Sequence, residues 1–204
     1  RNFKGFSTFN AYFSMPKITI PSSEGTIRDH CFEEFVNLEK LTIPSSVTVI
    51  GSSAFKNCTS LKKLVIPSSV ISIEDFAFQG GTSLSKITFD DHSQLNSIDS
   101  FAFNDCSSLS ELNVPSNATV IGSSAFKECV SLHAASISAS VNSIVSFAFQ
   151  RCSSLETVLF DDHSRLNSIG NFAFQGCTSL AKISIPSSQS VRKSIGEGSL
   201  PYRL

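Results

Sequence analysis

The sequence has no tryptophan, only two tyrosines and one methionine, and few charged residues. Charged residues make up 16% of the 204, and the 16 Lys and Arg nearly balance the 17 Asp and Glu, which leaves a net charge of -1. A chain with this balance has no overall attraction to nucleic acid or to an anionic membrane, so we expect neither as a partner. It also has no apolar run long enough to insert into a bilayer.

Signatures of catalysis and of cofactor binding are missing as well. There is no glycine-rich phosphate loop, no G-x-S-x-G and no C-x-x-C. Two D-D-H-S tetrads, residues 90–93 and 161–164, place Asp beside His. However, Asp and Ser side chains commonly cap the backbone of turns, which explains both tetrads without a function. We therefore expect no enzyme activity, no cofactor and no metal site.

Phenylalanine, by contrast, occurs 18 times, and seven of these residues recur at a regular interval. They are Phe32, Phe55, Phe78, Phe103, Phe126, Phe149 and Phe174. The successive spacings are 23, 23, 25, 23, 23 and 25 residues, and three of them add up to the 71 residues that separate "IGSSAFKNCTSL" from "IGSSAFKECVSL". The two extra residues of each longer unit fall in a turn of the type "FDDHSQLNSI". The chain is thus an array of short repeats.

Each unit follows the template I-x-x-x-A-F-x-x-C-x-S-L-x-x-L-x-I-P-S-S, in which the apolar residues before the proline alternate as in a strand. One strand and one turn cannot bury their own apolar face, but stacked copies can. We therefore predict a solenoid of about eight coils with a parallel sheet. The predicted strands are Lys40–Pro44, Lys63–Pro67, Lys86–Phe89, Glu111–Val114, Ala134–Ile137, Thr157–Phe160 and Lys182–Ile185.

The L-x-x-L-x-L core, combined with the "IGxxAFxxCxSL" segment, resembles the BspA-like leucine-rich repeats of bacterial surface proteins and of protozoa such as Trichomonas and Entamoeba. The resemblance covers roughly residues 9–188. It implies an α/β-type solenoid, a right-handed leucine-rich-repeat superhelix with its parallel sheet on the concave face. It also implies cell-surface adhesion and no catalytic residues. We expect one domain over residues 1–204, with an N-terminal partial repeat or cap (1–26), regular repeats (27–188) and a C-terminal partial repeat or tail (189–204).

Five of the six cysteines occupy one column of the repeat, where other units have Phe35 and Gly81. A position that accepts Cys, Phe or Gly faces inward. Parallel side chains in neighbouring coils lie too far apart at Cβ for a disulfide, and a column does not supply convergent ligands for zinc. We therefore expect buried free thiols that act as small hydrophobic side chains, with disulfides and metal as the less favoured alternatives.

The residue before the second Leu of each strand should point outward, and this column starts with four lysines. The predicted ligand-binding residues are these lysines and the threonines of the next outward column: Lys17, Lys40, Lys63, Lys86, Thr19, Thr42 and Thr88. Neighbouring ammonium groups about 5 Å apart repel by about 0.8 kcal/mol even in water. They either keep a solvated sheet soluble or bind an anionic ligand, such as an acidic glycan or an acidic patch of a protein.

Two N-x-T sequons, at Asn57 and Asn117, are predicted glycosylation sites if the chain is secreted by a eukaryote. The first residues contain neither an initiating Met nor a signal-peptide hydrophobic core, so we expect a fragment or a mature form. The favoured function is a non-catalytic recognition module, an adhesin-like protein located extracellularly or at the cell surface. The alternative is an intracellular, cytoplasmic scaffold or regulator of an enzyme partner, which the free thiols would suit.

Overall fold

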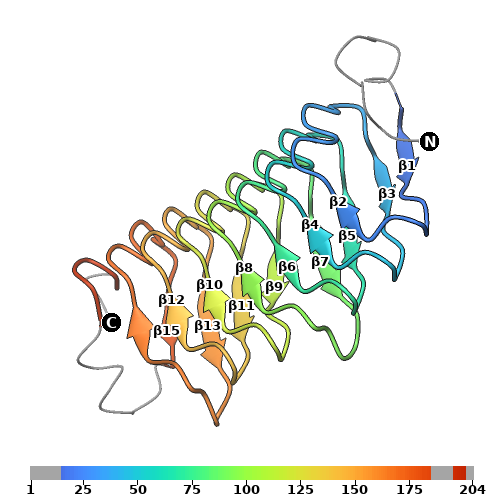
Figure 1. Ribbon diagram of the computed structural model, residues 1–204. Helices are drawn as coiled ribbons and strands as arrows, with labels where there is room; N and C mark the ends of the chain where they lie inside the picture. Colours follow the sequence, from blue (N-terminus) through green and yellow to red (C-terminus); the bar gives the residue numbers. More distant parts are fainter. Residues whose placement is uncertain (1–14, 185–194, 201–204) are drawn as a thin grey trace.

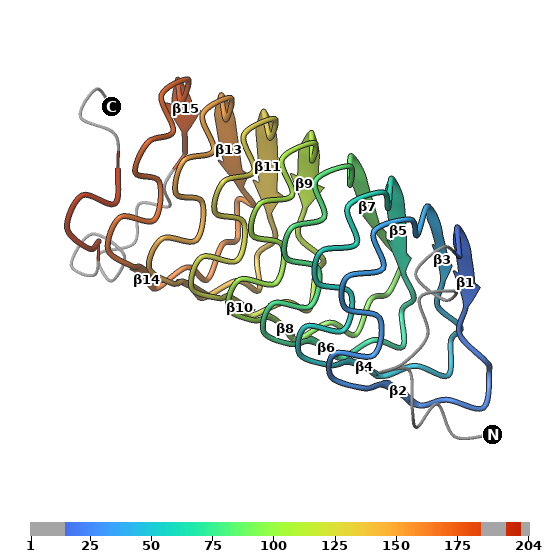
Figure 2. The same cartoon turned by 90° about the horizontal axis from the view of Figure 1, so that it is seen from above.

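The computed structural model describes residues 15–184 and 195–200 and confirms a solenoid of stacked, parallel-strand coils (Figure 1). Each coil contributes a longer strand to one side and a two-residue strand to another, and Figure 2 shows these as two separate rows. The longer strands, which have three or four residues except for the two of β15, are β1 (Lys17–Thr19), β3 (Lys40–Thr42), β5 (Lys63–Ile66), β7 (Lys86–Phe89), β9 (Glu111–Asn113), β11 (Ala134–Ile137), β13 (Thr157–Phe160) and β15 (Lys182–Ile183). With the seven two-residue strands they make about seven turns, slightly fewer than the predicted eight coils.

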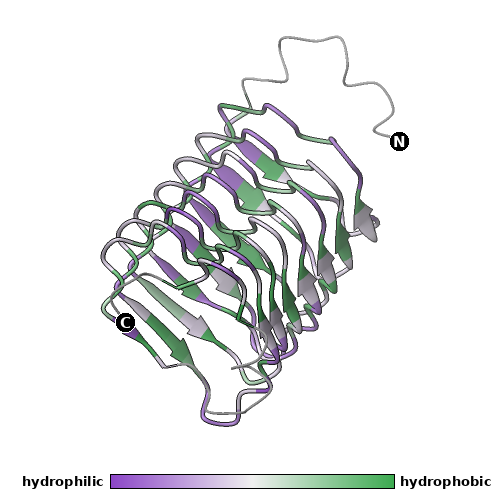
Figure 3. Ribbon diagram, turned by 90° about the vertical axis from the view of Figure 1, so that its left-hand side faces the viewer, coloured by the Kyte–Doolittle hydropathy of each residue, from purple (hydrophilic) through white to green (hydrophobic). Residues whose placement is uncertain are grey.

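The longer strands form two parallel sheets of four strands, in the orders β1-β3-β5-β7 and β9-β11-β13-β15. The seven predicted strands are confirmed, most of them ending one or two residues early. Along β5 the burial pattern alternates between exposed and buried, because Leu64 and Ile66 point into the core while Lys63 and Val65 point outward. Figure 3 shows the result as rows of hydrophobic and hydrophilic residues that run along the solenoid.

The short strands form a third, continuous sheet that the sequence pattern did not predict. They are β2 (Thr26–Ile27), β4 (Val49–Ile50), β6 (Ser72–Ile73), β8 (Ser97–Ile98), β10 (Val120–Ile121), β12 (Ser143–Ile144) and β14 (Ser168–Ile169). All seven are parallel and in register, with the isoleucine of each strand paired to the isoleucine of the next. Two residues are too few to show the alternation by which strands are recognised in a sequence.

The "AF" segment of each coil forms a third line of contacts between coils. The amide of Phe55 donates to the carbonyl of Ala77 at 2.8 Å, and the equivalent bond recurs in the other coils. The seven repeat phenylalanines stack face to face, with ring centroids 5.2 to 5.5 Å apart. This stack fills the centre of the core and continues through the 25-residue coils, so their extra residues lie elsewhere.

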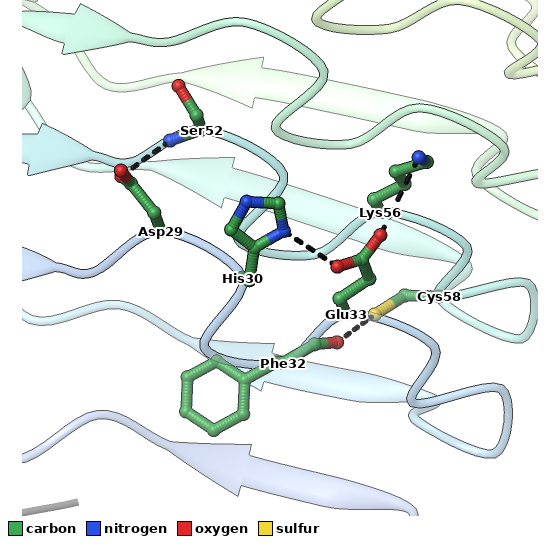
Figure 4. Close-up of polar contacts among 7 residues, drawn as sticks. All are labelled: Asp29, His30, Phe32, Glu33, Ser52, Lys56 and Cys58. Atoms are coloured by element: carbon green, nitrogen blue, oxygen red, sulfur yellow. Dashed lines mark hydrogen bonds and ion pairs between the residues drawn. The ribbon is translucent and has the colours of Figure 1, made fainter. Parts of the chain in front are cut away.

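The cysteine column is buried, and its thiols are free, as predicted. Each thiol donates a hydrogen bond to the carbonyl of a repeat phenylalanine in the preceding coil, as Cys58 does to Phe32 at 3.3 Å (Figure 4). Burial raises the pKa of the Cys58 and Cys106 thiols from 9.0 to about 12. The sixth cysteine, Cys31, is half-buried, and burial raises its pKa as well.

Turns, rather than helices, connect the strands throughout the described residues, so the predicted α/β-type solenoid contains parallel strands and no helix there. At the C-terminal end, Ile195 forms an isolated parallel bridge with Ile169, so pairing between coils continues beyond β14. The first part of the N-terminal partial copy, including Phe9 and Tyr12, and the end of the last predicted strand at Ile185 lie outside the described residues. The predicted domain boundaries stay predictions.

Candidate recognition surface

Four lysines lie side by side on the exposed face of the first sheet. Lys17 pairs with Lys40, Lys40 with Lys63, and Lys63 with Lys86 in the parallel register of β1, β3, β5 and β7. All four side chains are exposed. We call these four residues the lysine ladder. Within the described part of the chain, no ion pair neutralises any of them.

The next outward position of the same strands lies beside the ladder. Thr19, Thr42 and Thr88 are exposed there, as predicted, and Val65 is 53% exposed in the remaining strand. Hydroxyl groups thus flank the lysines on three strands. Beside the ladder, Lys62 forms an ion pair with Glu39 at 3.4 Å. Both side chains of this pair are exposed, so the Glu39 carboxylate offsets little of the ladder's charge.

The second sheet presents a different surface in the same two columns. Its ladder positions are Glu111, Ala134, Thr157 and Lys182. The carboxylate of Glu111 lies 3.4 Å from the ring of His133. In the other column, Leu159 is 43% exposed. Consecutive lysines are therefore confined to the first sheet, and the second sheet has a single lysine, Lys182, in this column.

The two sheets meet at β7 and β9, which form no parallel strand pairing with each other. A groove of about 420 Å³ lies there, along β7, the turn after it, and the end of β9. The two extra residues of the first long coil lie between β7 and β8, since nine positions separate Lys63 from Ser72 but eleven separate Lys86 from Ser97. The second long coil has the same insertion, yet β13 still pairs with β15. The insertion alone therefore does not separate the strands.

The D-D-H-S tetrads form the turns after β7 and β13. In the second, the amide of His163 donates to Asp161 Oδ1 at 2.9 Å, and the amide of Leu166 donates to Ser164 Oγ at 3.3 Å. In the first, the amide of Leu95 donates to Ser93 Oγ at 3.3 Å. These are the side-chain-to-backbone bonds of ordinary turns. Across the residues that the structure describes, no three His, Cys, Asp or Glu side chains converge as metal ligands.

The two predicted glycosylation sites differ in their surroundings. Asn57 is half-buried and has a left-handed backbone, with φ of 59°. Asn117 is exposed, but its Nδ2 donates to the carbonyl of Ser93 at 2.8 Å. A glycan on Asn117 would attach to the same nitrogen and replace one of its two hydrogens. Both sites stay predictions.

Comparison with known protein families matches residues 5–127 and 92–199 to the BspA type leucine rich repeat region, in six copies. The chain belongs to this family. The predicted family is thereby confirmed. A comparison with curated protein sequences gives no significant match.

Three solved bacterial structures are similar to this member of the BspA-type family. The leucine rich repeat protein of T. pallidum is 28% identical with a TM-score of 0.76, over 91% of this chain and 87% of its own. A leucine rich cell surface protein of Faecalibacterium prausnitzii is 30% identical with a TM-score of 0.71, over 87% of this chain and 50% of its own. A leucine-rich repeat protein of Eubacterium ventriosum is 26% identical with a TM-score of 0.75, over 86% of this chain and 46% of its own. The chain spans about half the length of the last two.

Proposed function

We propose that this chain is a non-catalytic recognition module of a cell-surface protein, and that its lysine ladder binds an anionic partner. The ladder itself is the observation that supports this most strongly. Four exposed lysines in register repel one another, and no carboxylate among the described residues pairs with them. An anionic ligand would replace this repulsion with attraction.

An extended ligand fits the geometry of the ladder. Neighbouring strands of a sheet are about 4.8 Å apart, so four lysines span about 14 Å across the strands. The hydroxyl groups of Thr19, Thr42 and Thr88 lie beside them and can donate hydrogen bonds to the same ligand. An acidic glycan and an acidic segment of a protein both offer negative charges in a row.

The cell-surface location is supported by a relative. The F. prausnitzii protein, which is 30% identical to this chain, is described as a cell surface protein. Within residues 15–184 and 195–200, the structure has no apolar helix of membrane-spanning length. Adhesion to a host cell or matrix is the role that we propose for such a surface.

Charge reversal of the ladder tests the proposal. We expect the triple variant Lys40→Glu, Lys63→Glu and Lys86→Glu to elute from heparin at much lower salt than the wild type, because three attractive charges become repulsive. The control reverses three cations outside the ladder: Arg28→Glu, Lys127→Glu and Arg165→Glu. Both variants have the same net charge. Equal elution of the ladder variant and the control would exclude the ladder as the binding surface.

An intracellular scaffold or enzyme regulator is the second candidate, and the five buried free thiols favour it. Free thiols persist in reducing compartments and are less common in secreted proteins. Mass spectrometry of the protein from its native source separates the two candidates. Glycans on Asn57 or Asn117 would establish secretion and exclude the intracellular role.

A further inference from the structure

The groove between β7 and β9 has the size of a small-molecule site. Its volume of about 420 Å³ falls within the range of about 300–1,000 Å³ that is usual for ligand pockets. Lys86 and Thr88 of β7 line it on one side, and Asn113 of β9 lines it on the other. Asp90 and Asp91 line it from the turn after β7.

Hydrogen bonds hold the backbone around the groove in place, whereas four polar side chains in it have no hydrogen-bond partner among the described residues. The amide of Asp90 donates to the carbonyl of Ile66 at 3.0 Å, and the buried Ser93 accepts a bond from Asn117 at its carbonyl. The side chains of Lys86, Asp90, Asp91 and Asn113 make no hydrogen bond or ion pair within the described residues. The hydrogen-bonded backbone needs little ordering when a ligand binds, and the unpaired side chains leave their donors and acceptors available to it at the cost of their own rotamer freedom.

The missing pairing between β7 and β9 adds backbone groups to this site. Within each of the two sheets, neighbouring strands pair, as β7 does with β5 and β9 with β11. No such pairing joins β7 to β9. The peptide groups on the two facing edges therefore need other partners, and a ligand rich in donors and acceptors can supply them.

The mixture of charges indicates which class of ligand fits. Lys86 supplies one cation, Asp90 and Asp91 supply two hydrogen-bond acceptors, and Asn113 supplies both donors and acceptors. Two carboxylates repel a polyanion such as an acidic peptide, but they accept hydrogen bonds from hydroxyl groups. The matching ligand carries one negative charge and several hydroxyl groups.

We propose that this groove binds one acidic sugar residue, a monosaccharide unit with a single carboxylate. Lys86 pairs with the carboxylate, while Asp90 and Asp91 accept bonds from the sugar hydroxyl groups. The inference rests on the proposed function, because Lys86 is also the last lysine of the ladder. It names the glycan, and not the protein segment, as the ladder's ligand.

The second long coil provides a control within the same molecule. It carries the same D-D-H-S turn, with Asp161 and Asp162 in place of Asp90 and Asp91. However, Thr157 stands in the position of Lys86, and β13 pairs with β15. The second turn therefore has the carboxylates but neither the cation nor the unpaired strand edge.

Titration with N-acetylneuraminic acid and with glucuronic acid, followed by NMR of the whole chain, tests the proposal. We expect Asp90→Ala combined with Asp91→Ala to weaken sugar binding by about tenfold or more, because charge-assisted hydrogen bonds are lost. The same variant should bind heparin as well as the wild type or better, because it carries two fewer negative charges. The control, Asp161→Ala with Asp162→Ala, makes the same charge change and should bind both sugars as the wild type does. Matched thermal melts would show that both variants are folded.

Three results would overturn the inference. One is that neither sugar binds to the wild type, another is that the variant Asp90→Ala with Asp91→Ala binds the sugars as well as the wild type or better, and the third is that a glutamate-rich peptide displaces the bound sugar. None of these results bears on the ladder, whose heparin binding is measured separately. Conversely, a wild type that binds the sugars but is not retained on heparin would remove the proposed function and leave the groove.

Discussion

At the scale of single residues, all complete coils share two positions in the left-handed region of the backbone map, and the turn after β7 adds a third at His92. The shared positions lie two residues before and two residues after the repeat phenylalanine. The later position is Glu34, Asn57, Gly80, Asp105, Glu128, Arg151 or Gly176, with φ between 56° and 77°. A residue with a Cβ pays about 1–2 kcal/mol for this conformation, which glycine adopts freely. The template reveals the position only through its two glycines, so the sequence analysis did not predict it.

This strain leads to a prediction for Glu34, whose φ is 63° and whose side chain is exposed. We expect Glu34→Gly to raise the free energy of unfolding by about 0.5–1 kcal/mol, because glycine relieves the strain but adds entropy to the unfolded chain. Urea unfolding measures the change. The matched control is Gly80→Ala at the same position of another coil, which should destabilise the protein, because Gly80 has φ of 70° and the new Cβ would meet Asn57. A less stable Glu34→Gly variant would contradict the explanation.

At the scale of elements, the phenylalanine stack holds successive coils together. Phe126 is fully buried between Phe103 and Phe149, with ring centroids 5.5 Å away on both sides. Phe32 lies at one end of the stack and has one stacked neighbour, Phe55, besides an edge contact with Phe35. Packing of this kind makes the stability of a solenoid a sum of terms between neighbouring coils.

The difference between these positions can be measured. We expect Phe126→Ala to lower the free energy of unfolding by about 3–5 kcal/mol, the usual cost of a large cavity in a core. Phe32→Ala should lower the free energy of unfolding by less than Phe126→Ala does, because it removes one stacked contact rather than two. The comparison uses the midpoints of urea unfolding for the two variants and the wild type. Equal losses would mean that the rings act independently of their neighbours.

The elements show how far a repeat pattern predicts structure. The longer strands were predicted because Leu and Ile alternate with polar residues before a proline, as in β5. The short strands were missed, although their isoleucines recur in every unit, because two residues carry no alternation. The break between β7 and β9 was also missed. It depends on how two coils pack, and the second long coil shows that the same inserted turn is compatible with pairing.

At the scale of the whole molecule, the column of buried thiols makes stability depend on pH. The Cys58 and Cys106 thiols have an ordinary pKa of 9.0 that burial raises to about 12, and burial also raises the pKa of Cys129 and Cys152. Below about pH 9, the folded and the unfolded chain both keep these protons, so the contribution is fully present. As the pH rises from 9 toward 12, only the unfolded chain loses them, and the free energy of unfolding falls.

Unfolding at increasing pH checks this expectation. Cys58→Ala combined with Cys106→Ala should reduce the alkaline loss of stability, since two of the titrating groups are gone. A small residue is compatible with this column, where Gly81 already stands. Thiol labelling supplies a second readout: in the folded protein, a reagent should modify the half-buried Cys31 before the buried five. An identical pH dependence in the double variant would contradict the assignment.

The candidate site was predicted in part. The lysine ladder follows from the repeat alone, because a fixed period places equivalent residues of successive coils next to one another. The structure places Lys17, Lys40, Lys63 and Lys86 in that register. The groove could not be predicted in this way. Its walls come from β7, the turn after it and the end of β9, and the repeat pattern does not show how much space two packed coils leave between them.

The 71-residue duplication has a consequence for how such a protein changes in length. Its two copies keep the short strands and the phenylalanine stack in phase, since both continue through the two long coils. Unequal recombination between the copies would add or delete a block of three coils, about 14 Å of solenoid, without creating a new type of junction. A gene of this design can extend the reach of its product in whole blocks. Each added block would bring its own inserted turn, and later point substitutions could give that turn a different ligand.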